Sequence, residues 1–272
     1  MALVQLSPTK AGAYLDCPRK YFLSYVSRKR HGRRWAHLSF GNAVHGALRY
    51  WFDLPAEQRT TDQAARLVGE SWNNDGFRNA EQAERWKQRA TEMVAAYLSE
   101  LDPSFDPLST ERTLAFKTET FIMQGRIDRL DDDDDGVTVV DYKTGRNVPT
   151  EDEVRGSAAL AMYAVMVQHV LRRPCTSVAL HHVPSGERVS WQHSEESLTT
   201  QVRRMETLAA DISRAQDTWD SLDEACEESE ALDALFPATP SPLCGFCDYW
   251  DVCAQGQAHS VRRESWEGLE RD

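Results

Sequence analysis

The feature that most constrains the fold of this chain is a run of five aspartates at 131–135, closed by Gly136. Segments rich in apolar and β-branched residues lie on either side, at 121–130 and 137–143. This arrangement predicts an antiparallel hairpin with an acidic turn. If 131–136 form the loop, Leu130 pairs with Val137, and Asp128 faces Val139.

Side chains alternate between the two faces of a strand, so Asp128, Asp141 and Lys143 share one face of this hairpin. The two aspartates become diagonal neighbours, about 7–8 Å apart. At that separation both carboxylates can reach one hard cation. The alternative is a solvated face on which Lys143 bridges Asp141, and the hairpin alone leaves both interpretations open. In either case we expect 131–135 to be a solvated turn.

The order of the expected elements indicates the fold class. Helices are predicted at 8–16, 19–26, 39–52, 61–101, 151–171 and 195–216, and further strands at 111–118, 176–183 and 187–192. The acid-rich segment 217–235 reads as a solvated face or linker. We expect a mixed α/β (α+β) fold with a central mixed β-sheet flanked by helices. Its parts are a helical region at 1–110 packed on the core, a core at 111–216 and an acidic linker with a cysteine-rich tail at 217–272, and we expect them to form one integrated domain.

Composition narrows the class of protein. The chain has 272 residues, and no apolar run approaches the length that spans a membrane. Its first residues lack the apolar region of a signal peptide, so we expect a cytoplasmic protein with no membrane partner. Six cysteines in such a chain favour metal or cluster ligation over a disulfide framework.

The net charge of −12 is unevenly distributed. Residues 1–50 contain nine Lys or Arg and one acid, for a local charge of +8, and the remainder carries −20. A local basic patch can attract a polyanion whatever the total charge. The candidate DNA contacts in this region are Arg19, Lys20, Arg28, Lys29 and Arg30. A merely solvated basic helix and loop is the alternative.

The tail contains Cys244, Cys247 and Cys253 at a spacing typical of a metal or cluster site. Zinc and iron–sulfur sites both use four ligands. Cys17, between two predicted helices, is the best fourth candidate, and His259 is an alternative. No histidine stands at zinc-finger spacing, which favours a cluster over zinc. The remaining cysteines, Cys175 and Cys226, lack this setting.

Four stretches, in this order, carry a family resemblance: LSPTKAGAYLDCPRKYFLSYV, FGNAVHGAL, GRIDRL followed by VVDYKTG, and CGFCDYWDVC. Together they resemble the RecB-type branch of the PD-(D/E)XK nuclease superfamily. The closer similarity is to small stand-alone RecB-family exonucleases with a 4Fe–4S cluster, related to the CRISPR-associated adaptation nucleases. The resemblance covers nearly the whole chain and implies a restriction-endonuclease-like fold.

The resemblance also implies roles for individual residues. His45, Asp128 and Asp141 match the ligands of Mg²⁺ or Mn²⁺, and Lys143 completes the D-x-K element. Glu111 matches an acid at the start of the preceding strand. The cluster ligands correspond to Cys17, Cys244, Cys247 and Cys253, with zinc the less favoured occupant.

The implied function is a metal-dependent DNA nuclease, an exonuclease on single strands or DNA ends, in repair, recombination or defence. Tyr163 could stack on bases, and a helicase or repair partner would have to unwind duplex because the chain has no Walker A loop. One position departs from the family, since Ala159 stands where a glutamine is common. That departure motivates an alternative: a catalytically weak DNA-binding or partner-binding protein that keeps the nuclease fold.

Overall fold

A six-stranded mixed sheet forms the centre of the computed structural model, which describes residues 3–27, 32–222 and 228–269. Strands run in the order β1 (Val4–Leu6), β3 (Phe121–Asp133), β4 (Gly136–Lys143), β5 (Cys175–His182) and β6 (Arg188–Trp191), and β2 (Ser109–Lys117) also pairs with β3. The β1–β3 and β4–β5 pairs are parallel, and the others are antiparallel. The predicted mixed sheet is therefore confirmed.

The described residues before β2 are mainly helical apart from β1. They contain α1 (Pro8–Asp16), α2 (Pro18–Tyr21) with a π-helical turn at Phe22–Val26, α3 (Ala36–Asp53), short 3-10 turns at Ala56–Gln58 and Thr61–Gln63, α4 (Ala64–Ser71) and α5 (Ala80–Leu98). The predicted start at Ser7 and Pro8 is confirmed, because the Ser7 hydroxyl accepts a hydrogen bond from Lys10 N at 3.2 Å.

The second half differs from expectation in two places. The single helix predicted at 151–171 is wrong: Ser157 separates α6 (Glu151–Gly156) from α7 (Ala158–Met166), whose N-terminus it caps, and a π-helical turn (Val167–Leu171) follows. The segment 217–235 is not simply a linker either. Helix α8 (Glu195–Asp220) extends into it, and α9 (Glu228–Leu235) leads to the fully buried Phe236.

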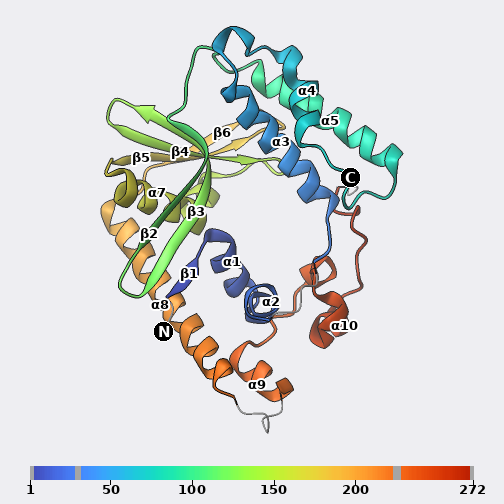
Figure 1. Ribbon diagram of the computed structural model, residues 1–272, viewed down its shortest axis with the longest axis vertical. Coiled ribbons are helices and arrows are strands. Elements are labelled where there is room, and N and C mark those ends of the chain that lie inside the picture. Colours follow the sequence, from blue (N-terminus) through green and yellow to red (C-terminus); the bar gives the residue numbers. More distant parts are fainter. Residues whose placement is uncertain (1–2, 28–31, 223–227, 270–272) are drawn as a thin grey trace.

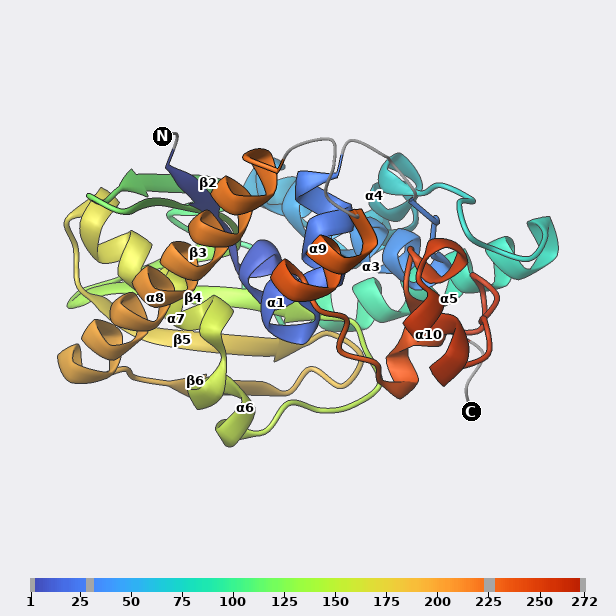
Figure 2. The same cartoon turned by 90° about the horizontal axis from the view of Figure 1, so that it is seen from below.

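The C-terminal part consists of 3-10 turns at Pro242–Phe246 and Trp250–Val252 and the short helix α10 (Ala254–His259). Figures 1 and 2 both show this part beside α1 and α2, so segments far apart in sequence are neighbours. Among the described helices, none combines the length and apolarity needed to cross a bilayer.

Helices cover both faces of the sheet and divide the core in two (Figure 1). On one face, Val139 and Val178 belong to a cluster with the apolar residues of α7 and α8. On the other, Val140 and Ala179 pack with α3, α4 and α5. Consecutive strand residues therefore belong to different clusters, as the two-residue period requires.

The β3–β4 hairpin forms, but its register differs by two residues from the expected one. Leu130 pairs with Val139, and Asp133 with Gly136, so the loop is shorter than predicted. Asp131 forms an ion pair with Arg129 at 2.8 Å, and Asp132 forms one with Arg173 at 2.5 Å. These cations offset the acidic charge. The expectation of a turn at 131–135 is wrong for its first three residues, which end β3, although Asp132 and Asp133 are exposed. A shift of two preserves which side chains share a face.

Candidate active site and cysteine cavity

The acidic side chains expected at the site stand where two strands separate. Both β1 and β4 pair with the same edge of β3, β1 with its first residues and β4 with its last. The β3–β4 ladder ends at the pair Arg129–Val140, and the next residue on each strand is Asp128 or Asp141. Asp128 Oδ2 accepts a hydrogen bond from Tyr142 N at 2.8 Å, so this carboxylate spans the gap between the strands.

A third carboxylate comes from β2. Because Thr110 pairs with Arg129 and Arg112 with Ile127, Glu111 stands opposite Asp128. The Glu111 backbone has φ +48°, in the left-handed region that non-glycine residues seldom adopt. Its Oε2 atom meets Arg126 Nε at 2.7 Å. Glu111, Asp128 and Asp141 therefore lie on three adjacent strands.

His45, on α3, completes a group that can hold a cation. Its Nδ1 atom lies 3.3 Å from Asp128 Oδ2. One potential ligand atom from each of His45, Glu111 and Asp128 lies within 4.8 Å of the other two. Asp141 falls outside this group and lies 2.5 Å from Lys143 Nζ.

These residues suit a hard divalent cation. Carboxylate oxygens with one imidazole are typical ligands of Mg²⁺ and Mn²⁺. The Oε2 of Glu111 and the Oδ2 of Asp141 are buried, and within the described chain neither accepts a well-aligned hydrogen bond. Both oxygens therefore have free lone pairs that a cation could use, in addition to their contacts with Arg126 and Lys143.

Crowding of the carboxylates perturbs their protonation. Burial and the nearby charge of Asp128 raise the pKa of Glu111 and that of Asp141, although Lys143 partly opposes the second shift. Burial lowers the pKa of His45, but the hydrogen bond and charge of Asp128 outweigh burial, so the net shift is upward. A bound cation would reverse this balance because it favours ionised carboxylates and a neutral imidazole.

Tyr163, expected to stack on bases, and Ala159, which replaces the family glutamine, both lie on α7. Tyr163 on α7 is buried, with its ring against Gly125, and burial followed by the charges of Asp141 and Asp128 raises its pKa. Ala159 is partly buried and packs on the core.

Of the predicted basic contacts, the two within the described residues, Arg19 and Lys20, lie beside the C-terminal part and not at the carboxylates. Arg19 is buried and binds the C-terminal part. Its Nε atom donates to Phe236 O at 2.9 Å, and its guanidinium forms an ion pair with Asp233, so the prediction that it contacts DNA is wrong. Lys20 borders the cysteine region. Arg28, Lys29 and Arg30 lie outside the described residues.

The four predicted cysteines surround one cavity of about 430 Å³, the cysteine cavity. Its thiols come from Cys17, between α1 and α2, and from Cys244, Cys247 and Cys253 in the C-terminal part. Three accept backbone N–H groups: Thr239 N to Cys17, Ser241 N to Cys244 and Gly256 N to Cys253, at 3.3–3.4 Å. Such hydrogen bonds stabilise thiolate charge.

The described thiols are less tightly gathered than the ligands of one bound zinc ion. Tetrahedral zinc, with Zn–S bonds of about 2.3 Å, brings its sulfurs to about 3.8 Å from one another. Within the described chain, no three cysteine sulfurs lie within 4.8 Å of one another. His259 is exposed and does not line the cavity, Cys175 lies in β5, and Cys226 is outside the described residues.

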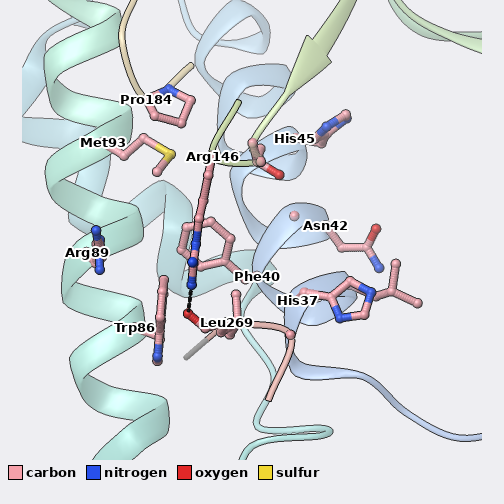
Figure 3. Close-up of a pocket in the computed structure, with 15 residues that line it drawn as sticks. His37, Phe40, Asn42, His45, Trp86, Arg89, Met93, Arg146, Pro184 and Leu269 are labelled. Carbon is pink, nitrogen blue, oxygen red and sulfur yellow. Dashed lines mark hydrogen bonds between the residues drawn. The ribbon is translucent and has the colours of Figure 1, made fainter. Parts of the chain in front are cut away.

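The sequence did not predict a larger cavity between α3 and α5, with a volume of about 780 Å³. Figure 3 shows Phe40 on one helix and Trp86 on the other, with Arg146 extending between them. We call it the α3–α5 cavity. Its only sequence signals were the spacing of Trp86 and Arg89 by three residues, which places them on one helical face, and the position of Arg146 just after the D-x-K strand.

Comparison with known proteins gives a family match. A family model described as the PD-(D/E)XK nuclease superfamily matches residues 5–254. No curated protein matches the chain. A solved structure entitled "Crystal structure of SSO0001" is similar at 14% sequence identity, with a TM-score of 0.35, and the alignment covers 87% of this chain and 94% of that one.

Proposed function

The chain belongs to the PD-(D/E)XK nuclease superfamily, and on that premise we propose that it is a metal-dependent deoxyribonuclease. The observation that supports this most is the alignment of Glu111, Asp128 and Asp141 on three adjacent strands, with His45 and Lys143 beside them. Crowded carboxylates repel one another even with Arg126 and Lys143 beside them, as the raised pKa of Glu111 and of Asp141 shows, and a divalent cation would offset that repulsion.

Each residue has a proposed part. Mg²⁺ or Mn²⁺ at such a site supplies a water nucleophile at neutral pH and neutralises charge on the phosphate. His45, Glu111 and Asp128 would hold the ion. Asp141 would be a further carboxylate ligand, through its buried Oδ2 atom. Lys143, half-exposed and anchored by Asp141, would orient the attacking water or stabilise the charge that develops on the phosphate.

We further propose an exonuclease of the RecB type, acting on single strands or DNA ends in repair, recombination or defence, with a cytoplasmic location. The four resembling stretches support this, as does the related CRISPR-associated group. The acidic remainder of the chain disfavours wrapping of long duplex, and unwinding would be left to a helicase or repair partner.

The cysteine cavity would hold a 4Fe–4S cluster. Support comes from four thiols around one space and from the backbone N–H groups directed at three of them. Because Cys17 and the other three thiols lie at opposite ends of the chain, a cluster would tie those ends together. Iron and sulfide in anaerobically purified protein would support the cluster, whereas zinc without iron would contradict it.

A nuclease assay tests the central proposal. Wild type, Asp141→Ala and Lys143→Ala are compared on single strands, duplexes and flaps with Mg²⁺ or Mn²⁺. We expect cleavage by wild type that both substitutions reduce strongly, and equal activity in all three would exclude this site. Tight DNA binding without cleavage on any substrate would instead select the non-catalytic alternative that Ala159 motivates.

A further inference from the structure

We propose that the α3–α5 cavity binds an unpaired nucleotide of the DNA strand that is cut. The inference rests on the proposed nuclease function and adds a substrate subsite to it. The first support is charge. The whole chain has a net charge of −12, yet none of the 15 described residues that line the cavity is Asp or Glu. Arg89 and Arg146 are among them, so the lining suits a phosphodiester backbone.

The second support is an aromatic platform. Trp86 is partly exposed, and Phe40 holds it edge-on, with the ring centroids 5.4 Å apart and the planes at 84°. The guanidinium of Arg89 lies over the Trp86 ring, 5.0 Å from its centroid, in a cation–π contact, and forms no ion pair with the described residues. An aromatic ring beside a free cation is the usual means of binding single-stranded nucleic acid, since the ring stacks on a base and the cation contacts phosphate.

Arg146 is held in place at the opposite wall. Its Nη2 atom donates to Leu269 O at 2.9 Å, a bond drawn in Figure 3. The loop that carries it is fixed in turn, because His182 Nε2 lies 2.8 Å from Gly145 O and Val183 N donates to Lys143 O at 2.9 Å. A pre-ordered side chain loses less entropy when it binds a ligand.

The cavity is close to the proposed cleavage site. His45 borders the cavity, while its Nδ1 atom contacts Asp128. Arg146 follows Lys143 by three residues, a separation of at most roughly 11 Å. A stacked strand advances about 3.4 Å per nucleotide, so a base in the cavity would lie within about three nucleotides of the scissile phosphate.

The shape of the cavity favours an unpaired base. Its volume of about 780 Å³ is typical of a pocket for a small ligand. A base inside a duplex is stacked on its neighbours and cannot present a free face to Trp86, whereas an unpaired base can. The cavity should therefore favour single strands or frayed ends over blunt duplex.

Fluorescence anisotropy in EDTA measures binding without cleavage. The probes are fluorescein-labelled oligothymidine and a blunt duplex of equal length. The variants are Trp86→Ala, Trp86→Phe and Arg89→Gln, with Lys87→Gln as the control because Lys87 is a cation on a different face of α5 that does not line the cavity. Thermal unfolding confirms that each variant is folded.

We expect Trp86→Ala to weaken single-strand binding by roughly 5- to 150-fold, the range for loss of one base-stacking contact. Trp86→Phe should restore most of this affinity. Arg89→Gln should reduce the slope of log Kd against log salt by about one unit, and Lys87→Gln should match wild type. Duplex binding should change little.

Wild-type affinity in Trp86→Ala, or an equal loss for duplex and single strand, would overturn the subsite. If Trp86→Ala does not fold, Arg89→Gln decides: a reduced salt slope supports the subsite, and wild-type affinity and slope overturn it. If wild type still cleaves DNA with Mn²⁺, either of these outcomes refutes the subsite and leaves the nuclease proposal intact. A wild-type protein that neither binds nor cleaves DNA would refute the nuclease proposal itself.

Discussion

Glu111 stands opposite Asp128 on the adjacent strand while its backbone adopts a φ of +48°. That conformation is strained for any residue with a side chain, by roughly 1–2 kcal/mol. It places a buried carboxylate beside two others, and burial together with Asp128 raises its pKa. Strain combined with unfavourable electrostatics is typical of a functional site, where ligand binding compensates for both.

The first prediction follows from this strain. Without metal, Glu111→Gly should raise the stability of the protein by about 1 kcal/mol, since glycine adopts positive φ freely and the substitution removes a repelled charge. The thermal midpoint would then rise by roughly 2–4 °C. Thr113→Gly, at an exposed position on the same strand, serves as the control and should destabilise the protein. A lower midpoint for Glu111→Gly would contradict the strain argument.

The second prediction concerns the metal itself. Mn²⁺ should raise the thermal midpoint of wild type because it binds the folded state alone. That rise should be abolished in Glu111→Gly and strongly reduced in His45→Gln, both of which remove members of the proposed ligand group. Differential scanning fluorimetry across a Mn²⁺ titration measures it. An undiminished rise in both variants would place the ion elsewhere.

The third prediction uses Lys143. Lys143→Ala should slow cleavage by roughly 10²- to 10³-fold, the usual loss when one group that stabilises transition-state charge is removed. Single-strand affinity should stay near wild type. Lys117→Ala removes an exposed lysine at the end of β2 and should leave the rate unchanged. Single-turnover rates distinguish the two, and similar rates for both variants would remove Lys143 from the mechanism.

The hairpin shows how much the sequence could reveal. Side chains alternate between the faces of a strand, so the sequence predicted that Asp128 and Asp141 share one face. That prediction holds despite a register error of two residues, because a shift of two does not change the face. The register of the β3–β4 pair could not be predicted from the sequence. Five aspartates disfavour a strand, but ion pairs with Arg129 and Arg173 and the hydroxyls that Thr138 and Thr176 donate to Asp133 satisfy the first three.

Elsewhere in the site, too, features set by local sequence could be predicted, and features set by packing between distant segments could not. Local spacing singled out Cys244, Cys247 and Cys253, and all three line the cavity together with Cys17, which was the favoured fourth candidate from the other end of the chain. The strained φ of Glu111 and the cavity between α3 and α5 depend on packing between distant segments, which no local pattern encodes. Arg19 was misjudged for that reason, since its partners Asp233 and Phe236 lie more than 200 residues away.

The fourth prediction is a pH dependence. The pKa of His45 in the metal-free protein is raised above the unfolded value of 6.5, chiefly by Asp128 acting against burial. The contribution of His45 to stability is then fully present below pH 6.5 and is lost as pH rises through its folded pKa. In EDTA, His45→Gln should therefore destabilise the protein more at about pH 6 than at about pH 9. Urea unfolding measures this, and a larger effect at high pH would contradict it.

The fifth prediction concerns the cysteines. Cys253→Ser should lose bound iron and lower the thermal midpoint, because the N- and C-terminal parts would no longer be tied together. Cys175→Ser is the matched control, since Cys175 lies in β5 and burial raises its pKa to about 12. It should retain the iron of wild type. Iron content together with visible absorption measures the outcome, and equal loss in both variants would contradict the assignment.

The most direct test of the account is the rate of single-strand cleavage at saturating Mn²⁺ for wild type and Asp128→Asn. Asp128 contacts His45, bridges to Tyr142 N and faces Glu111, so every part of the proposed site depends on it. We expect the substitution to reduce the rate by on the order of 10³-fold in a folded protein that still binds single-stranded DNA. A rate equal to that of wild type would contradict the assignment of this site as the nuclease centre.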